Sequence, residues 1–395
     1  MNILITSFSF PSYKNKTYDG KFIYSEAIAY TRNGANVRVI TPHYLGVDKE
    51  EQTKENIRIF RFQYFFPKSL QVLKKPGKPI YSTKSFFAIL QIPFLCFVFI
   101  LNILKHAPWA DIIHAQWTVT ALLALPAKWV FKKKIILTVR GSDIRLLPKV
   151  INRFIHRQVD AAIDCFPEPW SNKYKQGFPA HYITLPLIVH RDDPRLMPED
   201  MKIILKEKSD PFIIMYVGRF DYIKIKSNKL PLINVIHASK ILKLKQMNFH
   251  VFYLGDGEED LTREMSRLII GMDLQEYISL LGPKTNVLDY IHFCHLGIGG
   301  IAFNAVSQEF TVSSKPQILI DGKDNMGAPW RHRINSIFIR PDDKEDLVEK
   351  LIWAIKNSEQ IQEIGKKAKN EMKKYIVDSK LGGKLYLNEF HNLIN

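Results

Sequence analysis

Two cations follow a glycine at the end of an apolar segment. Phe212–Val217 is apolar or aromatic, which is typical of a strand covered on both faces, and Gly218, Arg219 and Lys224 come after it. Gly218 allows the backbone to turn and to approach a ligand closely. Ligands of open α/β sheets bind at the carboxyl ends of the strands, and an arginine with a lysine there suits a diphosphate. The alternative is a plain strand-to-helix turn with solvated cations.

The second half of the chain holds further candidates for the same ligand. Gly255 and Gly257 end another apolar segment and suit a tight turn, and Pro283 lies in the next turn at a strand end. Glu309 is a carboxylate in a mostly uncharged stretch, with Phe303 shortly before it. Such a carboxylate can accept two hydroxyls of a ribose. The alternative for Glu309 is an ordinary charge near a helix start, stabilised by the helix dipole.

Two loops of the first half carry weaker signals. Gly20 precedes the start of a helix, where backbone N–H groups can hold a phosphate or a sugar. Arg140 and Asp143 follow a strand and flank a glycine, which places a cation and a carboxylate at a strand end; alternatively, Asp143 simply caps the next helix. The chain contains no G-x-G-x-x-G motif, which disfavours a nicotinamide or flavin cofactor.

Short β-rich segments alternate with helical ones along the whole chain. This alternation predicts βαβ units, parallel sheets and the α/β class. In the first half we expect a helix over Phe22–Arg32 and strands at Ile3–Thr6, Val37–Thr41, Asp111–His114, Ile135–Thr138, Ala161–Asp164 and Tyr182–Leu185. In the second half we expect strands at Phe212–Val217, Phe249–Leu254, Tyr277–Leu281, Leu296–Ile298, Gln317–Ile320 and Ile337–Ile339.

The segment Pro186–Glu207 is rich in Pro, Asp and Arg and has no hydrophobic period, so we expect the join between two domains there. The predicted domains are residues 1–190 and 191–378. A helical stretch from Glu345 to about Tyr375 closes the second domain. Residues 379–395 are expected to cross back onto the first.

The composition favours an anionic partner. The 395 residues include 56 Lys and Arg against 39 Asp and Glu, a formal net charge of +17, which attracts nucleic acid or an anionic membrane surface. The lack of a zinc-finger spacing and of an RNA-binding aromatic motif disfavours nucleic acid. Cys96, Cys165 and Cys294 are far apart, so we expect no disulfide framework and no metal site. We expect the N-terminus to be a first strand and not a signal peptide. Together with the cysteine usage, this predicts a cytoplasmic protein.

One segment of the first half is almost continuously apolar. Phe86–Leu104 is about long enough to span a bilayer, but Gln91, Pro93 and Asn102 interrupt it. Aromatic and basic residues precede it over 65–78, a combination that suits a segment lying in the interface of an anionic membrane. The alternatives are a buried core helix behind a solvated basic loop, and a true membrane span.

The motifs, taken in order, resemble those of the retaining GT-B glycosyltransferases of family 4. Asp111–Trp117 resembles the family's D-x-x-H-x-H-W, and Thr138–Asp143 resembles T-x-H-G-S-D with Arg140 in place of the usual histidine. Val217–Phe220 with Lys224 resembles V-G-R-L-x-x-x-K-G, and Leu254–Gly257 resembles x-G-x-G. The resemblance covers nearly the full length. It implies two Rossmann-like domains that face each other across a cleft.

The resemblance also implies roles. The second domain would bind a UDP- or GDP-linked sugar without a metal or cofactor, through Gly218, Gly255, Gly257, Pro283, Phe303 and Glu309. Arg219 and Lys224 would neutralise the leaving diphosphate. Gly20, Arg140 and Asp143 would face the sugar and a saccharide or lipid-linked acceptor. With the apolar segment, this implies a peripheral enzyme on the cytoplasmic face of a membrane.

Two departures from the family pattern leave alternatives open. Ile301 stands where the family has the first of two glutamates, so a catalytically idle GT-B scaffold is one alternative. An epimerase acting on a free nucleotide sugar is another. Lys224 is followed by Ile225 instead of glycine, with Lys226 and Lys229 nearby, so any of the three lysines could meet the phosphate.

Overall fold

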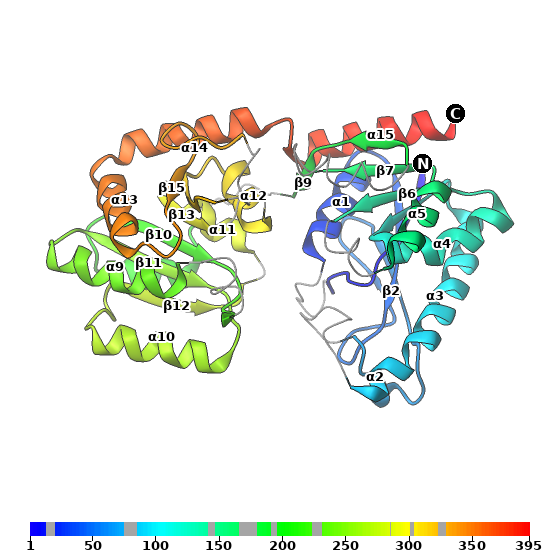
Figure 1. Ribbon diagram of the computed structural model, residues 1–395, viewed down its shortest axis with the longest axis horizontal. Helices are drawn as coiled ribbons and strands as arrows, with labels where there is room; N and C mark the ends of the chain where they lie inside the picture. Colours follow the sequence, from blue (N-terminus) through cyan, green and yellow to red (C-terminus); the bar gives the residue numbers. More distant parts are fainter. Residues whose placement is uncertain are drawn as a thin grey trace. The chain divides into compact units, whose positions relative to one another are not determined.

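The computed structural model describes residues 1–12, 20–74, 85–140, 147–165, 180–190, 196–222, 231–284, 286–300, 304–322 and 329–395. The chain forms two compact units (Figure 1). The first consists of Met1–His190 with Val377–Asn395, and the second of Arg191–Ile376. The predicted site residues Asp143, Lys224 and Phe303 lie outside the described residues.

The first unit is built on an eight-stranded sheet in the order β3-β4-β2-β1-β5-β6-β7-β8. Neighbouring strands are parallel, except β3 against β4. From β1 the chain first adds strands on one side and then on the other. Ligands of open sheets bind where this order reverses, here between β1 and β5. The strands are β1 (Asn2–Thr6), β2 (Asn36–Pro42), β3 (Glu50–Gln52), β4 (Arg58–Phe62), β5 (Ile112–Gln116), β6 (Lys134–Val139), β7 (Ala161–Asp164) and β8 (Tyr182–Thr184).

Helices cover both faces of this sheet because alternate strand residues point to opposite sides. Ile3 and Ile5 belong to the core under α1 (Lys21–Arg32) and α15 (Ser379–Ile394). Leu4 belongs to the core under three other helices. These are α3 (Ile92–His106), α4 (Thr118–Phe131) and α5 (Lys149–Gln158).

The C-terminal helix α15 packs closely on α1. A Cβ atom at Gly383 would lie 2.2 Å from the carbonyl oxygen of Ala29, so only glycine permits this approach. Before α15, strand β16 (Ile376–Asp378) pairs with β9 (Leu187–Val189) in a two-stranded sheet. The last residues of the chain therefore complete the first unit, although the second unit separates them from it in sequence.

The apolar segment forms a short helix, α2 (Phe86–Leu90), followed by α3. Gln91 joins them and is buried, where its amide donates to the carbonyl of Leu70 (2.7 Å) and accepts from the N–H of Val72 (3.2 Å). Among the described residues, Phe86–Trp109 is the one helix long and apolar enough to cross a membrane, and 28% of its most apolar 18-residue window is buried. Leu95, Phe99 and Ile103 are its buried side, against the sheet.

The second unit contains a six-stranded parallel sheet in the order β12-β11-β10-β13-β14-β15. The order reverses between β10 and β13, as in dinucleotide-binding sheets. The strands are β10 (Phe212–Val217), β11 (Phe249–Leu254), β12 (Ile278–Gly282), β13 (Leu296–Gly300), β14 (Gln317–Ile320) and β15 (Ile337–Ile339). Helices α9 (Leu232–Leu244), α10 (Glu259–Gly271) and α13 (Lys344–Lys356) share one core with the sheet, and α7 (Glu199–Leu205), α11 (Val287–His292) and α12 (Ala305–Val312) share the other.

The expected single helical stretch from Glu345 to Tyr375 is two helices. α13 ends at Lys356, and α14 (Ser358–Met372) begins after Asn357. The side chain of Asn357 donates to the carbonyl oxygen of Trp353 (2.7 Å), a local bond that competes with helix continuation.

Candidate functional site

Three loops meet at the carboxyl edge of the second sheet. Gly218 follows β10, Gly255 and Gly257 follow β11, and Gly282 ends β12. We call these four residues the glycine edge. The N–H of Gly218 donates to the carbonyl of Leu254 (3.0 Å), and the N–H of Gly255 donates to the carbonyl of Gly282 (2.9 Å). Backbone hydrogen bonds therefore hold the three loops together.

The loops after β10 and β11 approach each other so closely that a side chain would not fit between their backbones. A Cβ atom at Gly255 would lie 1.9 Å from the carbonyl oxygen of Gly218, and one at Gly257 would lie 1.8 Å from that of Phe220. Gly255 also has a φ of +145°, and Gly282 has a φ of +68°. These positions require glycine, and an edge without side chains at these points lets a ligand approach the backbone.

We expect the substitution Gly255→Ala to lower the melting temperature of the second unit by roughly 4–10 °C. The added methyl group would overlap the carbonyl of Gly218, and the positive φ adds strain, together about 2–3 kcal/mol or more. Differential scanning calorimetry measures the change. Gly271→Ala is the matched control, because a Cβ atom there has no neighbour within 4 Å. Equal melting temperatures for both variants would show that the loops do not touch.

Arg219 lies on this edge beside Gly218 and is exposed to solvent. Pro283 lies at the same edge, after Gly282. The cation next to Pro283, Lys284, is paired with Asp200 at 2.8 Å, so its charge is already balanced. Arg219 is the cation that directly adjoins Gly218 at the glycine edge.

Glu309 lies on α12, the helix that follows β13, the neighbour of β10. Asn304 caps this helix through a bond from the N–H of Ser307 (2.6 Å) and donates to the carbonyl of Gly299 (2.8 Å). Glu309 is half-buried in the second turn of the helix. The structure thus places Gly218, Arg219, Gly255, Gly257 and Pro283 together, with Glu309 on the helix beyond the adjacent strand.

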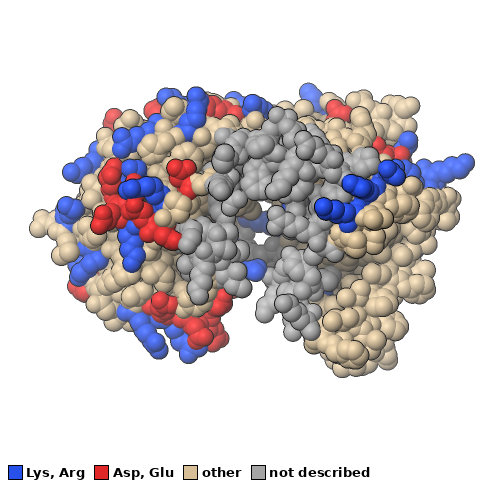
Figure 2. Space-filling model, in the orientation of Figure 1, with Lys and Arg blue, Asp and Glu red and all other residues tan. Residues whose placement is uncertain are grey.

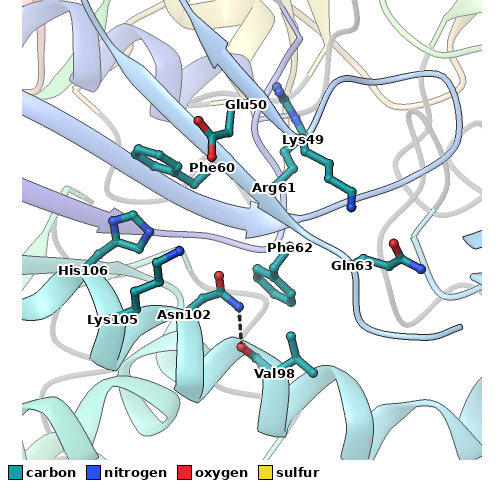
Figure 3. A pocket seen from close by; sticks show the side chains of 10 residues that line it. All are labelled: Lys49, Glu50, Phe60, Arg61, Phe62, Gln63, Val98, Asn102, Lys105 and His106. Carbon is teal, nitrogen blue, oxygen red and sulfur yellow. Dashed lines mark hydrogen bonds between the residues drawn. The ribbon is translucent and has the colours of Figure 1, made fainter.

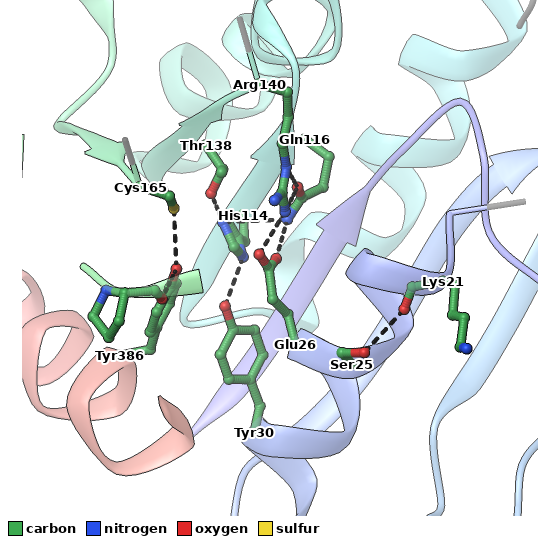
Figure 4. A network of polar contacts seen from close by, with 11 residues as sticks. Lys21, Ser25, Glu26, Tyr30, His114, Gln116, Thr138, Arg140, Cys165 and Tyr386 are labelled. Carbon is green, nitrogen blue, oxygen red and sulfur yellow. Dashed lines mark hydrogen bonds and ion pairs between the residues drawn. The ribbon is translucent and has the colours of Figure 1, made fainter. Parts of the chain in front are cut away.

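In the first unit, Arg140 follows β6 and belongs to a buried polar network (Figure 4). Its guanidinium contacts a carboxylate oxygen of Glu26 at 2.5 Å and donates to the amide oxygen of Gln116 at 2.8 Å. Gln116 in turn donates to the other oxygen of Glu26 (2.7 Å). The side chains of Arg140 and Glu26 are 11% and 1% exposed. Arg140 is therefore neutralised within the unit and is not a solvated cation.

The network continues through His114 and Tyr30, whose ring lies 5.9 Å from that of Tyr386 in the C-terminal helix. The imidazole of His114 bonds to Thr138 (2.7 Å) and to Tyr30 (3.3 Å), and Tyr386 of α15 bonds to Cys165 (3.4 Å). Burial, with a smaller contribution from Arg140, lowers the pKa of His114 to about 3. Burial raises the pKa of Cys165 to about 12. At neutral pH both groups are uncharged, so Glu26 and Arg140 are the charged pair of the network.

Gly20 and Trp117 also lie at this edge of the first sheet. Gly20 precedes α1 with a φ of +74°, and a Cβ atom there would lie 2.4 Å from the carbonyl of Ser9. Trp117 also has a φ of +74°, a costly conformation for a residue with a side chain, and its ring contacts that of Phe22 edge-on at 5.9 Å. Arg140 lies over the same Phe22 ring at 4.5 Å. Gly20, Trp117 and Arg140 are thus linked through α1.

No role was assigned to Glu26, Gln116 or Trp117 from the sequence, although Gln116 and Trp117 lie in the segment Asp111–Trp117 that carries the family resemblance. The signal for Glu26 was that it is the one acidic residue of α1, directly before the apolar run Ala27–Tyr30. Among the described residues, no group of three or more His, Cys, Asp or Glu side chains is arranged to hold a metal ion.

No protein-family model and no curated protein sequence matches the chain. Solved structures match over its full length. Alr3699/HepE from Anabaena in complex with UDP-glucose has a TM-score of 0.67 and 14% identity, covering 99% of this chain and 100% of that chain. Sucrose-phosphate synthase from Thermosynechococcus elongatus has a TM-score of 0.69 and 14% identity over the same shares. A glycosyltransferase from Rickettsia africae has a TM-score of 0.64 and 16% identity, covering 100% and 98%.

These likenesses establish the fold. The chain has the GT-B fold, with two Rossmann-like α/β domains, and the fold class expected from the sequence is confirmed.

Proposed function

We propose that this protein with the GT-B fold is a glycosyltransferase. It moves a sugar from a nucleotide-diphosphate donor to a saccharide or lipid-linked acceptor with retention of configuration. The observation that carries this proposal is the glycine edge with Arg219 beside it, at the carboxyl ends of β10, β11 and β12, where β10 is also the strand at which the order of the second sheet reverses. A bare backbone edge with one arginine fits a diphosphate, because the phosphates need close donors and a counter-charge.

The donor binds to the second unit in this proposal. Arg219 and Lys224 neutralise the diphosphate as it leaves, without a metal ion, and Glu309 accepts the ribose hydroxyls. Gly218, Gly255, Gly257 and Pro283 shape the edge, and Phe303 lies against the donor. The structural neighbour HepE was solved with UDP-glucose, which supports a UDP-linked sugar, and GDP is the second base to test.

The first unit binds the acceptor. Gly20, Arg140 and Asp143 face the sugar and the acceptor in this proposal. Because Glu26 neutralises Arg140, we assign Arg140 a positioning role in place of charge neutralisation. The arrangement of Trp117, Phe22 and Arg140 offers a partly apolar wall of the kind that carbohydrates contact.

A membrane surface is the proposed place of action, on the cytoplasmic face. Large apolar side chains of α2 and α3 are 39% to 82% exposed and form what we call the apolar face, made of Phe86, Phe87, Ile89, Leu90, Ile92, Phe94, Phe97 and Leu101. The opposite side of α3 is part of the core of the first unit. If α3 spanned a membrane, it would have to leave that core. Peripheral contact of the apolar face with the membrane surface therefore agrees better with the packing of α3 than a membrane span does.

A nucleotide screen tests the proposal. We expect one of UDP, GDP or ADP, or its common sugar conjugates, to raise the melting temperature, because a ligand present at a hundred times its Kd stabilises the folded state by about 2.7 kcal/mol. Product analysis with the bound donor then follows, with and without a saccharide acceptor. Sugar transfer supports the proposal. Nucleotide binding with neither sugar transfer nor donor hydrolysis indicates an idle scaffold. Formation of an epimerised donor in the absence of acceptor indicates an epimerase.

A further inference from the structure

A pocket of about 240 Å³ lies in the first unit, between strands β3–β4 and helix α3 (Figure 3). It is separate from the glycine edge, which belongs to the other unit. Phe60 and Phe62 form its floor on the strand side, and Asn102, Lys105 and His106 line it from α3. This volume is below the range of about 300–1,000 Å³ that buries a whole drug-sized ligand. A smaller polar group, such as a phosphate ester, matches it better.

The charge of the pocket is positive. Lys49 and Lys105 line it and are exposed, and neither forms an ion pair within the described part of the chain. Glu50 is the one carboxylate of the lining. The remaining cation, Arg61, has no exposed side-chain surface and is balanced by Glu51 at 2.8 Å. Two lysines against one glutamate leave a net positive charge for an anion.

His106 adds a neutral ring to the same pocket. Its imidazole lies against the ring of Phe60, with 4.4 Å between centroids. Burial, followed by the charges of Arg38 and Lys105, lowers the pKa of His106, so it is a neutral hydrogen-bonding group at pH 7. Lys49 and Lys105 therefore supply the charge that an anion would meet there.

Helix α3 joins this pocket to the apolar face. Val98, Asn102 and Lys105 recur at intervals of four and three residues and line the pocket. Phe94, Phe97 and Leu101 are 51%, 62% and 47% exposed and recur at the same helical spacing. At about 100° per residue, these two sets occupy adjacent sectors of the helix. One helix therefore presents a cationic pocket wall and an exposed apolar stripe side by side.

The surrounding surface is suited to lipid. Figure 2 shows a surface nearly without charged side chains over α2 and α3, at the lower right. In Figure 3, Lys105 and His106 extend from α3 toward β4, and Lys49 lies beside Gln63. A ligand that satisfies both regions has an anionic head and an apolar tail.

We propose that this lysine pocket binds the phosphate headgroup of an anionic phospholipid in a bilayer, while the stripe of Phe94, Phe97 and Leu101 contacts its acyl chains. The inference rests on the proposed membrane contact and names the lipid chemistry that would fix it. Charge complementarity selects anionic over zwitterionic lipid, and the apolar stripe selects a lipid over a free phosphate ester.

Vesicle flotation tests this inference on the full chain. We expect wild-type protein to bind vesicles of phosphatidylcholine with 30% phosphatidylglycerol, and the variant Lys49→Gln/Lys105→Gln to bind them at least roughly tenfold more weakly. Lys380→Gln/Lys384→Gln is the matched control, because it removes two exposed lysines from α15, on the other face of the sheet. Equal weakening of both double variants would overturn the pocket in favour of diffuse charge attraction.

A soluble lipid separates headgroup binding from free phosphate. Dihexanoyl phosphatidylglycerol below its micelle concentration is expected to raise the melting temperature of wild type but not of the pocket variant, and glycerol phosphate is expected to have no effect at the same concentration. An equal effect of glycerol phosphate would overturn lipid binding. Lipid binding would also be overturned if the protein forms a stable dimer in light scattering and fails to bind vesicles, because a second copy would then cover the apolar face.

The failures remain distinguishable. Nucleotide binding is measured without vesicles and reports on the second unit alone. If wild type binds neither these vesicles nor vesicles of phosphatidylcholine alone, both the membrane contact and this inference are wrong, while the donor site stands. If wild type binds vesicles and the pocket variant binds them equally well, only the lysine pocket is wrong.

Discussion

Replacing Arg219 by alanine is expected to lower kcat/KM for sugar transfer by about 10²–10³-fold. Arg219 is the cation beside Gly218 at the glycine edge, where the leaving diphosphate is proposed to gain negative charge. Removing one aligned charged donor from such a position costs about 2.7–4 kcal/mol of transition-state stabilisation. Nucleotide binding should weaken as well, because the charge-assisted bonds are also made to the bound donor.

The loss should not come from unfolding. Arg219 is exposed, and exposed substitutions change the free energy of unfolding by about 0.5 kcal/mol or less. Arg219→Lys keeps the charge but loses the planar pair of donors, so we expect partial activity. Steady-state kinetics with the donor found in the nucleotide screen measures both variants.

Arg263→Ala is the control for general charge loss in the same unit. Arg263 is 63% exposed on α10, and its ion pairs in the described part of the chain are local, with Glu259 and Asp260. Its replacement should leave kcat/KM unchanged. Similar activities for wild type and Arg219→Ala would remove Arg219 from the diphosphate site and leave that role to the lysines after it.

The strand ends were predictable because they depend on local patterns. The apolar segment Phe212–Val217 followed by Gly218 predicted both a central strand and a turn, and the structure has β10 and Gly218 there. The same pattern at Leu254 to Gly257 predicted the turn after β11. A parallel sheet then brings such turns to one edge, so the glycine edge follows from periodicity and topology together.

Strands β3 and β4, at one end of the first sheet, could not be predicted in the same way. β3 consists of Glu50, Glu51 and Gln52, and β4 contains Arg58 and Arg61 among three apolar residues without strict alternation. Their pairing depends on a specific contact between the two strands: Arg61 is buried because Glu51 of the neighbouring strand neutralises it. The sequence alone does not indicate that Glu51 and Arg61 pair, because nine residues of mixed polarity separate them.

Arg140 illustrates a similar limit for the site. Its place after a strand was predictable, but its chemical state depends on Glu26, which is 114 residues earlier in the chain. If Glu26 is not considered, the sequence around Arg140 suggests a free catalytic cation. With it, the pair is a neutral element that fixes α1 against β5 and β6.

Replacing Glu26 by alanine is therefore expected to destabilise the first unit by about 3–5 kcal/mol. Glu26 is 1% exposed, and its removal leaves the guanidinium of Arg140 buried without its counter-charge. It also removes the acceptor for the amide of Gln116. Denaturant unfolding, followed with a probe in the first unit, measures the change, because the two units need not unfold in one transition.

A double-mutant cycle separates this pair energy from simple loss of side-chain volume. Arg140→Ala leaves Glu26 as the unpaired buried charge. The destabilisation of the double variant Glu26→Ala/Arg140→Ala should therefore be smaller than the sum of the two single destabilisations. Glu363→Ala is the control, because its pair with Lys366 is more than half exposed and should be worth less than about 1 kcal/mol. Additive effects at Glu26 and Arg140 would mean that the two charges do not depend on each other. Strong coupling would mean that any activity lost in an Arg140 variant must first be corrected for unfolding, because Arg140 supports the edge on which the acceptor is proposed to bind.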